Sequence, residues 1–111
     1  MKVSIDQALK RLPAAPTDTY PQGAPFITML AGGTMRVEVF APRSADLQQP
    51  HAQDELYFVQ RGQGELVING QCFSAAAGEA FFVAAGVQHQ FENFSDDFVT
   101  WVVFYGPQGG E

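Results

Sequence analysis

Three side chains in this sequence have the types and the spacing that metal-dependent chemistry requires. His51 and Glu55 stand four positions apart, and His89, the other of the chain's two histidines, lies in a second short segment further along. Two imidazoles and one carboxylate can bind a divalent metal and leave positions open for substrate, water or dioxygen. We therefore expect these residues to hold Fe, Mn, Ni or Zn. No general base stands apart from them, so no catalytic residue beyond the metal ligands is expected.

The segment from Gln49 to Val59 decides which neighbours join this site. A helix would bring His51 and Glu55 together, but Pro50 and the aromatic and β-branched residues favour a strand. Alternate side chains of a strand share one face. That face would carry Gln49, His51, Gln53, Glu55 and Tyr57.

Five further residues are candidates for the edge of the site. Gln49 and Gln53 are weak candidate metal ligands, because a carboxamide oxygen binds these metals less strongly than imidazole does. Tyr57 and Phe91 each lie two positions beyond an expected ligand and would line a substrate pocket, although packing in the core explains Tyr57 equally well. Arg36 would line the pocket or form an exposed pair with the glutamate two positions later, and we favour the exposed pair.

The elements that must position these residues are predicted to be β-strands, preceded by one helix. Ser4 and Gln7 have the form of a capping box, and Pro13 ends the helical pattern. Residues 13–25 are rich in Pro, Gly, Thr and Ala and are interpreted as an arm that lies over the domain. Short strands separated by turns indicate a sandwich or a small barrel. The predicted strands are residues 26–30, 34–40, 55–61, 64–68, 71–74, 80–83, 89–94 and 98–105.

The segments around the two histidines resemble the paired motifs of the cupin superfamily. When the Glu of the first motif is placed on Glu55, its second His falls on His51 and its final Gly on Gly62. The second motif begins at Gly78 and fits the sequence without an internal gap. Its matching positions are Gly78, Gly86, His89 and Asn93.

Three positions depart from these motifs. Arg43 and Ala84 stand where the motifs have Gly and Pro, and both changes affect turns. Gln49 stands where the first His would be, which removes one ligand from the usual set of three His and one Glu. In an alternative register, His51 would take the place of the first His and Gln53 that of the second.

The resemblance implies an all-β fold, a single-domain jelly-roll (cupin) barrel over residues 26–111 with an N-terminal helix and arm over residues 1–25. Its pocket would lie inside the barrel and admit a small organic molecule. The chain would be a small-molecule-binding cupin with a 2-His-1-Glu metal site for dioxygenase- or isomerase-like chemistry. A non-catalytic metabolite-binding module is the alternative, because one fold serves many functions.

The amino-acid composition limits the binding partners and the cellular compartment that we expect for this protein. The net charge of −6 argues against nucleic acid and anionic membrane surfaces, which require basic patches. Cys72 is the only cysteine, so an internal disulfide is excluded and a cytoplasmic location is expected. The predicted strand 98–105 is apolar on both faces, so either the N-terminal arm or a second subunit must cover its outside. We favour a homodimer.

Overall fold

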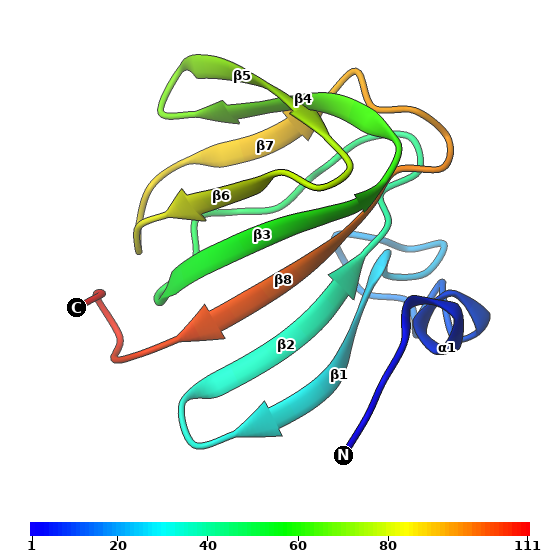
Figure 1. Ribbon diagram of the computed structural model, residues 1–111, viewed down its shortest axis with the longest axis horizontal. Helices are drawn as coiled ribbons and strands as arrows, with labels where there is room; N and C mark the ends of the chain where they lie inside the picture. The colour runs from blue at the N-terminus through cyan, green and yellow to red at the C-terminus, as the bar shows by residue number, and fades with distance from the viewer.

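Two antiparallel β-sheets face each other and enclose the core of the protein (Figure 1). The computed structural model describes all residues from 1 to 111. One sheet has the strand order β1-β2-β8-β3-β6 and the other has the order β5-β4-β7. The predicted all-β fold with a short N-terminal helix is confirmed. The elements are α1 (Ile5–Lys10), β1 (Phe26–Gly32), β2 (Met35–Phe40), β3 (Asp54–Arg61), β4 (Gln63–Ile68), β5 (Gln71–Ala76), β6 (Ala80–Val83), β7 (His89–Glu92) and β8 (Val99–Tyr105).

The ends of these elements follow from local sequence. At the start of α1, the Ser4 hydroxyl accepts from the Gln7 N–H and the Gln7 side chain accepts from the Ser4 N–H, so both arms of the predicted capping box are present. β7 ends at Glu92, two residues before the predicted end, because Asn93 adopts a left-handed φ of 50°. No helix in the chain is long and apolar enough to cross a bilayer.

The strand that carries Glu55, β3, starts at Asp54, one residue before the predicted strand 55–61. Residues 49–53, for which the sequence suggested an extended continuation, belong to the loop before it. In this loop the His51 carbonyl accepts from the Gly86 N–H at 2.8 Å, which ties it to the β6–β7 connection. The side-chain alternation of β3 therefore does not extend back to Gln49.

Aromatic side chains fill the space between the sheets and fix the strands that carry the candidate ligands. The ring of Phe91 on β7 lies with its centroid 4.9 Å from that of Tyr57 on β3 and 4.9 Å from that of Phe98. All three side chains are fully buried. The turn at Gly62 requires glycine, because φ is +79° and a Cβ there would lie 2.8 Å from the Cα of Phe98.

The outer face of the five-stranded sheet is only partly covered. Ile5 and Ala8 of α1 form a buried cluster with Val99 of β8, so the helix covers one end of this face, a role that the sequence analysis gave to the arm of residues 13–25 or to a second subunit. Further along the same face, Phe58 and Phe82 remain 43% and 53% exposed. The sheet thus has an apolar outer surface that the chain itself does not bury.

Candidate metal centre

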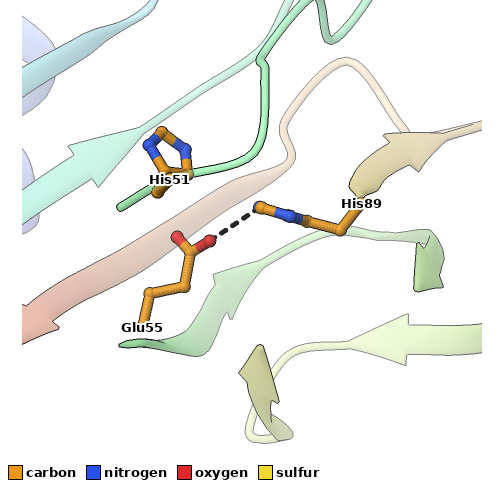
Figure 2. Close-up of side chains that lie close together, drawn as sticks. All are labelled: His51, Glu55 and His89. Carbon is orange, nitrogen blue, oxygen red and sulfur yellow. Dashed lines mark ion pairs between the residues drawn. The ribbon is translucent and has the colours of Figure 1, made fainter. Parts of the chain in front are cut away.

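The three predicted ligands come from separate parts of the fold (Figure 2). Glu55 lies near the start of β3, paired with Val83 of β6 and Phe104 of β8. His89 is the first residue of β7, in the opposite sheet. His51 lies in the loop before β3. The two sheets and one loop therefore meet at this point.

The ligand atoms of these residues converge. One atom from each of His51, Glu55 and His89 lies within 4.8 Å of the others. Nε2 of His89 is 2.7 Å from Oε1 of Glu55, and Figure 2 shows this ion pair with the His51 ring beside it. The side chains of the pair have no more than 1% of their surface exposed. The structure brings together all three residues that the sequence singled out.

The second carboxylate oxygen of Glu55 indicates whether a metal fits between the three ligands. Oε2 is buried and has no hydrogen-bond partner. A buried carboxylate oxygen without a donor is costly, and such an orphan is a typical sign of an ion site. Two imidazoles and a carboxylate are also a donor set that Fe, Mn, Ni and Zn accept. The residues present therefore fit a divalent cation.

A backbone carbonyl sets the orientation of His89. Nδ1 lies 2.9 Å from the carbonyl oxygen of Val87. Because that oxygen only accepts, Nδ1 carries the proton and Nε2 faces the site. Burial would lower the pKa of His89, but the hydrogen bond and charge of Glu55, with the Val87 carbonyl, outweigh it and raise the pKa. Without a cation, His89 thus favours the imidazolium paired with Glu55.

The pKa of His51 is shifted in the opposite direction to that of His89. Burial lowers the pKa of His51, although the charge of Glu55 opposes the shift. Its ring packs edge-on against Phe104 with centroids 4.8 Å apart, and the Arg36 guanidinium lies 4.5 Å from the centroid of the same Phe104 ring. His51 is therefore held as a neutral imidazole, the form that binds metals.

Tyr57 belongs both to the core and to the site. Its hydroxyl lies 2.9 Å from Nε2 of His89 and donates to Oε1 of Gln48 at 3.0 Å. Burial, followed by the charge of Glu55, raises the pKa of Tyr57 well above its ordinary value. The hydroxyl therefore keeps its proton and acts as a hydrogen-bond donor.

Sequence reasoning misses Asp46 and Gln48. Oε1 of Gln48 lies 3.0 Å from Nε2 of His51. Asp46 is buried and accepts from the backbone N–H groups of Phe91 and Gln48 at 2.8 and 3.1 Å. Burial raises the pKa of Asp46, while these hydrogen bonds oppose the rise. Both residues lie in an irregular segment whose sequence has no periodicity. The only signal available there is the tendency of an Asp side chain to accept a hydrogen bond from the backbone N–H two residues later.

The two glutamines predicted as weak ligands form no hydrogen bond with His51, Glu55 or His89. Gln49 is one of the residues that line the adjacent cavity. The side-chain amide of Gln53 donates to the carbonyl oxygens of Thr34 and Gly106, at 2.9 Å each, and Gln53 is outside the cavity lining. Gln53 thus links the β1–β2 hairpin to the end of β8.

A cavity of about 400 Å³ opens beside His51. Arg36 and Glu38 form the predicted pair, an ion pair of 2.7 Å in which Arg36 is 41% exposed, and both residues also line the cavity. Phe91, expected in the pocket wall, instead packs in the core behind Tyr57. The lining residues are Thr17, Thr19, Tyr20, Phe26, Arg36, Glu38, Phe40, Leu47, Gln48, Gln49, Pro50, His51, Tyr57, Val102 and Phe104.

Comparisons with known proteins agree with this architecture. The cupin domain family matches residues 36–105. The uncharacterized protein SCO3923 of Streptomyces coelicolor is 35% identical over 85 residues, which cover 75% of this chain and 81% of that protein. A cupin-2 domain containing protein from Shewanella frigidimarina has a similar structure, with a TM-score of 0.68, 13% identity and 91% of both chains covered.

A second relative has a different organisation. The HTH-type transcriptional activator RhaS of Yersinia pestis is 35% identical over 71 residues, or 64% of this chain. The match spans only 26% of RhaS, so the similarity concerns one part of that protein. The family match covers both candidate ligand segments and the strands of the two sheets that carry them. The chain belongs to the cupin family.

Proposed function

We propose that this cupin binds a divalent metal through His51, Glu55 and His89, and supports dioxygenase- or isomerase-like chemistry on a small organic substrate. The observation that carries the proposal is the convergence of three ligand atoms within 4.8 Å around a buried carboxylate oxygen that has no partner. A bound metal of this kind supplies Lewis-acid polarisation or, as iron, a site where dioxygen and substrate meet.

The chain's own residues would receive the substrate in the cavity beside His51. Apolar and aromatic side chains form much of its wall, and a few polar groups converge there, as in small-molecule sites generally. His51 and Tyr57 line the cavity, whereas Glu55 and His89 lie outside its lining and are buried. A substrate would therefore approach the metal from the side of His51, with Tyr57 available as a hydrogen-bond donor.

The test is the metal content of the purified protein beside that of His51→Ala. After incubation with Fe(II), Mn, Ni and Zn and removal of the excess, we expect close to one metal per chain in the wild-type protein. His51→Ala should lose most of it, because one of three ligands is gone. Gln53→Ala is the control, since the Gln53 amide donates its hydrogen bonds to two backbone carbonyls that do not belong to the site. Metal-free wild-type protein after all four incubations would refute the proposal.

The alternative function is a non-catalytic module that holds a metabolite in the same cavity. The similarity to part of a transcriptional activator favours it, because in that protein the matching segment accompanies other regions. The two functions are distinguished by whether the bound small molecule is converted into a product. Metal-loaded protein that binds a small organic acid or sugar without altering it or consuming oxygen would support the module, and product formation would support the enzyme.

We also propose that the chain forms a homodimer through the outer face of the five-stranded sheet. Phe82, Leu56, Val103 and Val37 pair in register across β6, β3, β8 and β2, which makes one continuous apolar row. α1 does not form part of this row, and Phe82 is 53% exposed. Apolar sheet faces of this extent are usually buried against another layer.

Sedimentation velocity tests the dimer. We expect the wild-type protein to sediment with twice the mass of one chain, and Phe82→Glu to sediment as a monomer, because a charge buried in an apolar interface is strongly unfavourable. Leu47→Glu is the control, since Leu47 is 45% exposed and lies beside the cavity. A monomeric wild-type protein at micromolar concentration would contradict this proposal.

A further inference from the structure

A side-chain oxygen outside the three predicted ligands is directed at the metal centre. Oε1 of Gln48 lies 3.0 Å from Nε2 of His51 and 3.0 Å from the hydroxyl of Tyr57. That hydroxyl is in turn 2.9 Å from Nε2 of His89. Gln48 thus contacts two of the groups that surround the candidate metal position.

Asp46 determines which end of the Gln48 amide faces the site. The Gln48 NH₂ group donates to Oδ2 of Asp46, and an ionised carboxylate only accepts hydrogen bonds. The amide nitrogen must therefore point to Asp46, and the carbonyl oxygen must point to His51 and Tyr57. Asp46 is itself held by the N–H of Phe91, two residues after His89. The Gln48 oxygen is in this way attached to the strand that carries a metal ligand.

The spacing of the donor atoms suits a shared ion. Nitrogen and oxygen ligands bind first-row metals at about 2.1 Å, so two ligands at a right angle on one ion are about 3 Å apart. Oε1 of Gln48 and Nε2 of His51 have this separation. In the absence of metal, Nε2 of the neutral His51 ring can donate to the amide oxygen, and metal binding at Nε2 would place the ring proton on Nδ1 instead.

Gln49 and Gln53, the two glutamines that the sequence suggested as weak ligands, have no hydrogen bond that directs their amide oxygens at the metal centre. The Gln53 amide bonds Thr34 and Gly106. Gln49 lines the cavity, but no hydrogen bond connects its side chain to the three ligands. We infer that Gln48 supplies the fourth protein ligand of the metal centre and that Asp46 is the positioning residue that directs its oxygen. The inference rests on the proposed metal-binding function and assigns to Gln48 the place that the sequence suggested for Gln49.

Co(II) titration of the chelator-treated protein tests the assignment, with binding followed by calorimetry and by the visible absorption of the bound ion. Gln48→Ala should weaken Co(II) binding about 10- to 100-fold and change the absorption bands, because water replaces a protein ligand. Gln49→Ala, the matched neighbour, should leave both unchanged. Asp46→Asn should weaken binding less than Gln48→Ala does, because the oxygen remains but is no longer held in one orientation.

The outcomes separate this inference from the metal site itself. If Gln48→Ala and wild-type protein bind Co(II) with equal affinity and equal spectra while His51→Ala does not bind, the metal site stands and the role of Gln48 is refuted. If Gln49→Ala weakens binding instead, Gln49 is the ligand and the assignment is wrong. If wild-type protein does not bind Co(II), both the metal site and its fourth ligand are refuted. Thermal unfolding of each metal-free variant confirms that a loss of affinity is not a loss of fold.

Discussion

Glu55→Gln is expected to weaken divalent metal binding by about 100-fold or more, the largest effect of any single substitution that preserves side-chain shape. Glu55 is the only charged ligand of the centre, and its second oxygen has no other partner. A carboxamide keeps the volume but removes the negative charge that a buried cation requires. Isothermal titration with Mn or Zn at neutral pH would measure the change.

The fold should survive this substitution. The carboxamide oxygen can still accept from Nε2 of His89, so the loss is that of a charge-assisted hydrogen bond, roughly 1–3 kcal/mol in the free energy of unfolding. Glu38→Gln is the matched control, because Glu38 is the other shielded glutamate near the site but is paired with Arg36. Equal loss of metal affinity in both variants would show that the general negative potential of the cavity, and not Glu55 as a ligand, attracts the cation.

The sequence predicted the framework of the site because strand periodicity and motif spacing both act over short distances. Glu55 and Tyr57 point into the barrel as the alternation of β3 requires, and both are 1% exposed. His89 begins the strand expected to carry it. The paired motifs add what periodicity cannot, namely that two segments distant in the chain face each other across the core.

The same reasoning failed where the chain leaves regular structure. Extending the alternation of β3 back to Gln49 placed the odd-numbered residues in the site. Because β3 begins at Asp54, the loop before it obeys no such rule. The even-numbered Gln48 contacts His51, and Asp46 accepts hydrogen bonds from Gln48 and from the backbone of β7. Their positions depend on hydrogen bonds to residues far along the chain, and a local pattern does not contain that information.

Arg36 shows a second limit of sequence reasoning. Charged residues that alternate with apolar ones usually face water, which favoured an exposed pair. In β2, Val37 and Val39 face outward, where Val39 packs with α1, and Arg36 and Glu38 therefore face the cavity. The alternation was correct, but the direction of each face depended on what covers the sheet.

Metal affinity is expected to fall as the pH decreases, beginning above the ordinary His pKa of about 6.5. A metal ligand must be unprotonated at the binding nitrogen, and the pKa of His89 is raised because Glu55 and the Val87 carbonyl outweigh the effect of burial. Below that raised pKa, affinity should decline about tenfold per pH unit. Because the pKa of His51 is lowered, protonation of that ring does not add to the loss of metal affinity over the same pH range. Zn titrations between pH 8.5 and 5.5 would measure the decline.

The metal-free protein should show the opposite dependence of stability on pH. A folded-state pKa above the unfolded value means that protonation of His89 stabilises the fold. This contribution is complete below the unfolded pKa of about 6.5 and is lost as the pH rises through the folded pKa. Urea unfolding of chelator-treated protein should therefore show a lower free energy of unfolding at pH 8.5 than at pH 6, and Glu55→Gln should reduce the difference. A stability that rises over this interval in wild-type protein but not in His89→Gln would mean that burial of His89 dominates over its pairing with Glu55, and the predicted onset of metal loss would then move below pH 6.5.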